Sequence, residues 1–89
     1  MLKQTLTIVN KLGLHARAAA KLVKLASSFK SDILLKRQQR EVNGKSIMGV
    51  MLLAAAKGTQ VELIISGTDE SLAMEKLSEL IQNRFGEEE

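Results

Sequence analysis

Residues 13–17 read Gly13-Leu14-His15-Ala16-Arg17 and lie where a β-type segment gives way to a helical pattern. A helix start presents unpaired backbone N–H groups and partial positive charge, so it is a ready site for anions. His15 is the only histidine in the chain, and Arg17 follows two residues later. Because an imidazole changes readily between nucleophile and acid, the spacing fits phosphoryl chemistry on His15. It fits equally well a polar residue at a helix start that has no chemistry.

The segments around this stretch predict a strand before it and a helix after it. From Leu2 to Val9 apolar and polar residues alternate, which is typical of a strand with one wet face. Residues 10–13 form a loop, and from Ala16 to Phe29 apolar residues recur at helical spacing. The chain therefore opens with a strand, a loop and an amphipathic helix.

The remaining sequence predicts three more strands and two more helices. Strands are expected over residues 31–36, 40–43 and 61–65, the first two joined by a polar turn at residues 37–39. An apolar helix follows Ser46, and a last helix begins with acidic Asp69-Glu70 and ends at Arg84 and Gly86. The order is β-α-β-β-α-β-α, an α+β arrangement for which one sheet covered on one face by helices is the natural layering. With no proline, linker or internal repeat, residues 1–89 are expected to form a single domain.

Composition excludes several classes of function. The chain has no cysteine, so it has neither a disulfide framework nor a thiolate metal site. One histidine supplies too few ligands for catalytic zinc, and no metal site is expected. The N-terminal residues lack the apolar run of a signal peptide, and no stretch approaches membrane-spanning length. We therefore expect a cytoplasmic protein.

The formal net charge is +3, and the charges are unevenly distributed. Basic residues dominate the first half, whereas acidic residues gather from Asp69 onward. A basic half suggests an acidic partner or a nucleic acid, although it can also be a solvated face without a partner. Two phenylalanines and no tyrosine or tryptophan leave no stacking platform for single strands. We expect no nucleic-acid partner.

The segment from Lys45 to Leu53 is the second informative stretch. Ser46 is a natural N-cap, and the apolar residues behind it surround the helix instead of forming one stripe. Ile47, Met48 and Met51 fall on one side and either form an exposed partner surface or fill gaps in the core. Ser46 is either a plain cap, which the sequence alone favours, or a phosphorylation site beside that surface.

Two stretches taken together resemble HPr, the histidine-containing phosphocarrier of the bacterial phosphoenolpyruvate phosphotransferase system. They are Asn10-Lys11-Leu12-Gly13-Leu14-His15-Ala16-Arg17-Ala18-Ala19 and Asn43-Gly44-Lys45-Ser46-Ile47-Met48-Gly49-Val50-Met51. Length, element order and the separation of the two motifs match over essentially the whole chain. The resemblance implies an open-faced β-sandwich, in which a four-stranded antiparallel sheet is covered on one face by three helices.

The resemblance also implies a function and roles for particular residues. His15 accepts a phosphoryl group on Nδ1 from enzyme I and passes it to a IIA protein or domain, with Arg17 as electrostatic partner. Ser46 matches the family's regulatory serine, which HPr kinase/phosphorylase modifies in some lineages. Such a carrier is a reaction intermediate rather than an enzyme, and we expect no cofactor and no membrane partner.

We expect the partner surface of a monomeric carrier to include six residues beside His15 and Arg17, namely Leu14, Lys24, Lys45, Ile47, Met48 and Met51. Many family members have proline directly after the arginine, where this chain has Ala18. Since alanine is an excellent helix former, we expect a slightly less constrained first turn and retained activity. The departure leaves both sugar transport and a regulatory, nitrogen-related branch open.

Overall fold

The computed structural model describes residues 1–88. In chain order the elements are β1 (Leu2–Thr7), α1 (Ala16–Ser27), β2 (Asp32–Arg37), β3 (Arg40–Asn43), α2 (Ile47–Leu52), β4 (Gln60–Ser66), α3 (Glu70–Gln82) and the short 3₁₀ helix η1 (Arg84–Gly86). The predicted order of strands and α-helices is confirmed, and η1 is an addition. Within this part of the chain, no helix is both long enough and apolar enough to cross a bilayer.

The four strands form one sheet in the order β1-β4-β2-β3. Every pair is antiparallel: β4 lies between β1 and β2, and β2 pairs with β3 through a tight hairpin. The turn of that hairpin places Gln38 at a positive φ of 56°, a conformation that closely joined antiparallel strands often require. The first strand of the chain thus pairs with the last, and β4 occupies an interior position in the sheet.

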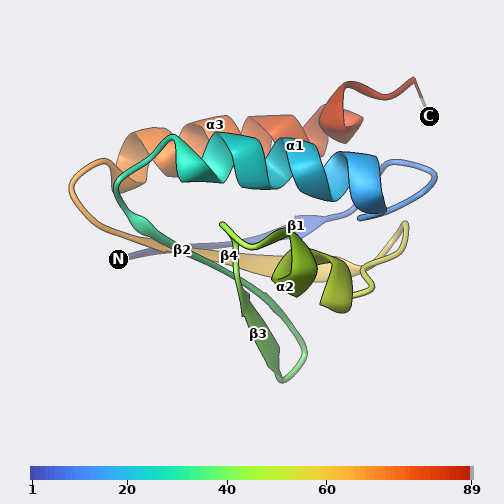
Figure 1. Ribbon diagram of the computed structural model, residues 1–89, viewed down its shortest axis with the longest axis horizontal. Coiled ribbons are helices and arrows are strands. Elements are labelled where there is room, and N and C mark those ends of the chain that lie inside the picture. The colour runs from blue at the N-terminus through green and yellow to red at the C-terminus, as the bar shows by residue number, and fades with distance from the viewer. Residues whose placement is uncertain (89) are drawn as a thin grey trace.

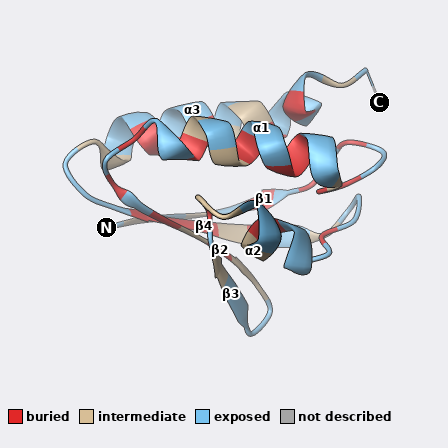
Figure 2. Cartoon of the chain, viewed as in Figure 1, coloured by how far each residue is buried: buried red, intermediate tan, exposed pale blue. Residues whose placement is uncertain are grey.

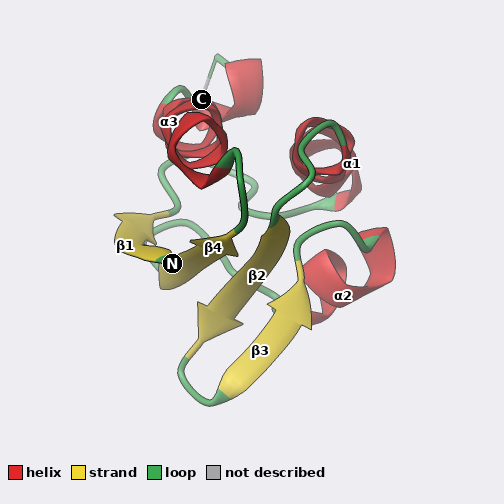
Figure 3. Ribbon diagram, turned by 90° about the vertical axis from the view of Figure 1, so that its left-hand side faces the viewer, coloured by secondary structure: helices red, strands yellow, loops and turns green. Residues whose placement is uncertain are grey.

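Three α-helices and the sheet make two layers, as Figures 1 and 3 show. α1 and α3 lie side by side over one face of the sheet, and α2 lies near β3 and packs against α1. The opposite face is open. The open-faced sandwich expected from the sequence is therefore confirmed.

The core lies between the sheet and the helices, where the buried segments of both layers face each other (Figure 2). Leu6 and Ile8 are buried while Thr5 and Thr7 are exposed, which confirms the alternation predicted for the first strand. α1 contributes a stripe of small and apolar side chains, Ala18, Ala19, Leu22 and Ala26. These residues are 0–1% exposed, so the helix lies directly on the sheet.

Two helix ends differ from the sequence prediction because buried aromatic residues lie beyond the helices. α1 ends at Ser27, and Phe29 packs into the core from the loop that follows. α3 ends at Gln82 rather than at Gly86. Beyond it Arg84 and Phe85 adopt left-handed conformations, with φ of 57° and 55°, and Gly86 has a φ of 77°. Phe85 is fully buried, and its burial offsets the backbone strain of this turn, roughly 1–3 kcal/mol for each non-glycine residue.

The left-handed turn reverses the chain and directs the C-terminal tail back toward the start of α1. The Lys21 ammonium group donates a hydrogen bond of 2.8 Å to the Phe85 carbonyl oxygen. The tail is thereby attached to α1 through Lys21 and to the core through Phe85. Figure 1 shows η1 at the same end of the molecule as the beginning of α1.

Candidate functional site

The loop before α1 fixes the position of His15. Gly13 has a φ of 67°, and a Cβ there would lie 2.6 Å from the Ala55 carbonyl oxygen, so only glycine fits. Leu14 donates its N–H to the same oxygen at 2.9 Å. Leu14 is only 6% exposed and belongs to the core. Leu14 therefore anchors this loop in the core and offers little side-chain surface to the partner expected there.

His15 is the N-cap residue of α1, with an extended backbone at φ −74° and ψ 178°. Its carbonyl oxygen accepts the first helical hydrogen bond, from the Ala19 N–H at 2.8 Å. Its side chain makes no capping hydrogen bond and is 27% exposed. The first turn of α1 contains no acidic residue, so its unpaired N–H groups and the helix dipole are available to an anion.

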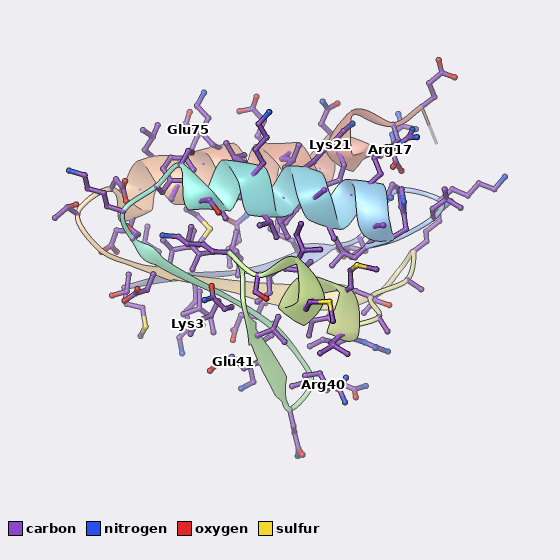
Figure 4. The ribbon with its side chains drawn as sticks, viewed as in Figure 1. Lys3, Arg17, Lys21, Arg40, Glu41 and Glu75 are labelled. Atoms are coloured by element: carbon purple, nitrogen blue, oxygen red, sulfur yellow. The ribbon has the colours of Figure 1, made fainter. Side chains whose placement is uncertain are left out.

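Arg17 lies on the first turn of α1 and is exposed, as Figure 4 shows for the labelled side chain. Within residues 1–88 its guanidinium group has no hydrogen bond or ion pair. His15 and Arg17 line one hollow of about 750 Å³, together with Lys11, Leu12, Ala16, Glu87 and Glu88. The two residues singled out by the sequence therefore border the same open space.

Glu87 is the site residue that the sequence analysis missed. Its Oε2 lies 2.5 Å from Nε2 of His15, although 72 residues separate them in the chain. A hydrogen bond from the Asn10 amide, and then that from the His15 ring, lowers the pKa of the Glu87 carboxyl below its ordinary value of 4.5. The nearby ammonium group of Lys21 acts in the same direction, against the opposing effect of burial. Glu87 is therefore ionised at neutral pH.

Asn10 holds the other oxygen of this carboxylate. It is fully buried, and its Nδ2 donates to the Gly13 carbonyl oxygen at 2.8 Å and to Glu87 Oε1 at 2.9 Å. Its own Oδ1 is buried without a hydrogen-bond partner. An unsatisfied buried polar atom costs about 1–3 kcal/mol, and turning the amide over would place its oxygen against two acceptors. In the sequence, Asn10 appears only as a polar residue in the loop before the motif, so nothing there indicated its contact with Glu87.

The second predicted region has the expected cap and an exposed apolar face. Ser46 is the N-cap of α2, and its Oγ accepts the Gly49 N–H at 3.1 Å. Ile47, Met48 and Met51 are 44%, 73% and 41% exposed. We name these three residues the α2 apolar face. They do not fill the core, a role that falls to Val50 and Leu53 on the other side of the segment.

The basic residues expected around this face differ in how they are held. Lys24 is exposed and lies seven residues after Arg17, on the same side of α1. Lys45 is half-buried, and its Nζ donates to the Phe29 carbonyl oxygen at 2.8 Å. The Lys45 ammonium group therefore tethers the start of α2 to the end of α1 as well as carrying charge.

Acidic and histidine side chains do not gather into a metal site in the described part of the chain, since none of its clusters has three such ligands. The chemistry of the site therefore lies in one imidazole, one arginine, a helix start and the Glu87 carboxylate.

Comparison with known proteins agrees with this arrangement. Residues 2–83 match the family model described as PTS HPr component phosphorylation site. Phosphocarrier protein HPr of Xylella fastidiosa is 59% identical over 88 residues, covering 99% of each chain. The crystal structure of HPr-C-His from Thermoanaerobacter tengcongensis is 46% identical, with a TM-score of 0.96 and full coverage of both chains. The crystal structure of an HPr dimer from the same organism has a TM-score of 0.79 at 46% identity, covering 98% of this chain and all of that one. The chain thus belongs to the HPr family, the phosphocarriers of the phosphotransferase system.

Proposed function

We propose that this chain accepts a phosphoryl group from enzyme I on Nδ1 of His15 and passes it to a IIA protein or domain. The observation that carries the proposal is the position of His15, the only histidine, partly exposed at the start of α1 beside the exposed guanidinium group of Arg17. A phosphoryl group on the ring would lie near the first-turn N–H groups and the arginine, both of which favour negative charge.

Arg17 stabilises the charge that develops on the phosphoryl oxygens during transfer. A guanidinium group can donate two hydrogen bonds to a phosphoryl group at once. In phosphoryl transfer the main contribution of a protein is positioning together with electrostatic stabilisation. The exposed arginine at the rim of the hollow supports this role.

The α2 apolar face, with Arg17, Lys24 and Lys45 around it, is the surface we propose for enzyme I and the IIA partner. An apolar centre with a charged rim is a common arrangement at protein interfaces, and basic rim residues steer toward acidic partners. We propose further that residues 1–89 act as one cytoplasmic, monomeric domain.

Ser46 is proposed as the regulatory site, for HPr kinase/phosphorylase where that enzyme exists. A phosphate there adds roughly two negative charges at the start of α2, next to Ile47 and Met48. It opposes docking of acidic partners without unfolding the helix, because a helix start accommodates anions.

The second candidate function is a purely regulatory interaction module, of the nitrogen-related or catabolite-control kind. It uses Ser46 and the α2 apolar face alone, and the exposure of that face supports it. A module that only docks has no need of a nucleophile at a helix start, so His15 favours the carrier.

The test is incubation with bacterial enzyme I and radiolabelled phosphoenolpyruvate. We expect an acid-labile, base-stable label on the parent chain and no label on His15→Ala, whose circular dichroism spectrum should match the parent. Acid-labile label on the variant would show that His15 is not the acceptor. A parent chain that takes up no label would favour the docking module.

A further inference from the structure

The contact between Glu87 and His15 constrains the protonation of the ring. A carboxylate has no hydrogen to donate, so the 2.5 Å contact between Glu87 Oε2 and His15 Nε2 requires the proton to be on Nε2. In a neutral imidazole the other nitrogen is then unprotonated and carries the free lone pair. The nitrogen left to act as nucleophile is Nδ1.

Three independent anchors hold Glu87 in this position. Asn10 fixes Oε1 from a fully buried position, the Lys21–Phe85 hydrogen bond attaches the tail to α1, and the buried Phe85 ring anchors the tail in the core. The Glu87 side chain is only 16% exposed. A surface carboxylate that met His15 by chance would not have both of its oxygens and the backbone before it fixed.

We infer that Glu87 is a positioning residue for phosphoryl transfer, which orients the His15 ring and keeps its proton on Nε2 so that Nδ1 reacts. The inference rests on the proposed function of His15 and extends it to the C-terminal tail. Asn10 acts one step further away, because it fixes the carboxylate that fixes the ring.

The arrangement allows transfer in both directions without moving a proton. The Nδ1 lone pair forms the N–P bond as the bond between phosphorus and the donor atom of enzyme I breaks, and the electron pair of that bond stays with the donor. The ring becomes an imidazolium with phosphorus on Nδ1 and hydrogen on Nε2. When the phosphoryl group moves on, the N–P electron pair returns to Nδ1 and the ring is neutral again.

Electrostatics favours this intermediate. The positively charged ring lies between the phosphoryl group at Nδ1 and the Glu87 carboxylate at Nε2. It attracts both negative groups and offsets the repulsion between them. A hydrogen bond between charged partners is about twice as strong as a neutral one. Glu87 therefore contributes more when the ring is phosphorylated than when it is free.

The first experiment reads the ring directly in the unphosphorylated protein. The ¹⁵N and ¹H signals of the His15 imidazole are recorded at neutral pH for the parent, Glu87→Ala, Glu87→Gln and the control Glu75→Ala, which removes an exposed carboxylate of α3 outside the site. We expect a slowly exchanging Nε2–H in the parent and the control, its loss in Glu87→Ala, and partial retention in Glu87→Gln, whose amide oxygen can still accept. Identical imidazole signals in Glu87→Ala and the parent would overturn the inference, whatever the carrier activity.

The second experiment follows transfer from phosphorylated enzyme I over a range of enzyme I concentrations. We expect Glu87→Ala to lower the maximal transfer rate about tenfold, as when a partner that orients a functional histidine is removed, with KM nearly unchanged. Glu87→Gln should restore only part of the rate because it lacks the charge, and Glu75→Ala should behave like the parent. A change in KM alone would show that the tail only assists docking and would overturn the positioning role. A parent chain that is not phosphorylated at all would instead refute the proposed function.

Discussion

Arg17 and Lys24 occupy the same side of α1 and carry the same charge, yet we expect them to act at different steps. Arg17 borders the hollow that contains His15, whereas Lys24 does not line it. Arg17 can therefore reach a phosphoryl group on the ring, and Lys24 can only attract a partner at a distance. We therefore expect Arg17 to act in the transfer step and Lys24 to act only in binding of the partner.

Charge reversal tests this separation. We expect Arg17→Glu to slow single-turnover transfer from enzyme I about a hundredfold, the scale of losing one donor to a developing anion, and to weaken binding much less. The matched control, Lys24→Glu, should weaken binding and leave the transfer step close to the parent rate. Equal transfer rates for Arg17→Glu and the parent would refute the role of Arg17.

Ser46 also has a purely structural contribution at the residue scale. Its Oγ accepts the Gly49 N–H at the start of a helix of only six residues. We expect Ser46→Ala to lower the free energy of unfolding by about 1 kcal/mol, the usual cost of losing an N-cap. Urea denaturation measures the change. Ser71→Ala is the control, since Ser71 is exposed on α3 and its hydroxyl has no partner in the described residues; a similar loss there would contradict the capping role.

At the scale of the elements, the ends of the helices are held by side chains from elsewhere in the chain. Arg37 and Arg40, on β2 and β3, donate to the carbonyl oxygens of Leu53 at 2.8 Å and Leu52 at 2.7 Å. Cations at a helix C-terminus satisfy its free carbonyl groups and oppose its partial negative charge. Two of the basic residues that suggested an acidic partner therefore stabilise the C-terminal end of α2.

Asp69 makes a comparable connection at the start of α3. Its side chain does not cap its own helix and instead accepts hydrogen bonds from the backbone N–H groups of Lys30 and Ser31 and from the Ser31 hydroxyl. The Ser31 hydroxyl, followed by the Lys30 N–H, lowers the pKa of Asp69 below its ordinary value of 3.8. The loop between α1 and β2 is thereby joined to α3.

The lowered pKa of Asp69 predicts a pH-dependent contribution to stability. A carboxyl whose pKa is depressed in the folded state stabilises it fully above the unfolded pKa, and this contribution disappears as pH falls through the folded pKa. We expect Asp69→Asn to be less stable than the parent at pH 7 and the difference to shrink below about pH 4. Urea unfolding at several pH values measures it. The exposed Asp32→Asn is the control, and a difference independent of pH would contradict the prediction.

At the scale of the whole molecule, the two regions that the sequence singled out lie on neighbouring helices. α1 and α2 pack together, so the site at the start of α1 and the α2 apolar face belong to adjoining elements. Figure 4 shows Arg17 and Lys21 projecting from α1 near the C-terminal tail. The late acidic residues are not all remote from this basic region, since Glu87 returns to His15.

A negative charge at Ser46 should weaken the association of enzyme I with the α2 apolar face. We expect Ser46→Asp to reduce phosphoryl transfer mainly by raising the dissociation constant, and added salt to relieve the defect in part, because salt screens repulsion between exposed charges. Ser46→Asn is the matched control, since it caps a helix as well as aspartate without the charge. Binding measured at low and high salt tests the effect. If the Ser46→Asp variant binds enzyme I as tightly as the parent at low salt, the α2 apolar face is not the docking surface and Ser46 has no regulatory role there.

Local sequence determined the elements and the proximity of His15 and Arg17. The alternation before Thr7, the helical spacing after Ala16 and the cap at Ser46 all depend on neighbours within a few residues, so they could be predicted from the chain. His15 and Arg17 share a site because they lie on the same helix start.

Only the tertiary structure decided what surrounds His15. Glu87 reaches the ring because Phe85 is buried and three consecutive residues adopt positive φ, and Asn10 reaches Glu87 across 77 residues of sequence. Leu14 turned inward for a similar reason, since its loop is tied to the Ala55 carbonyl oxygen. Such contacts depend on the packing of segments distant in sequence, and no periodicity or capping rule records them, because those rules describe only interactions between near neighbours in the chain.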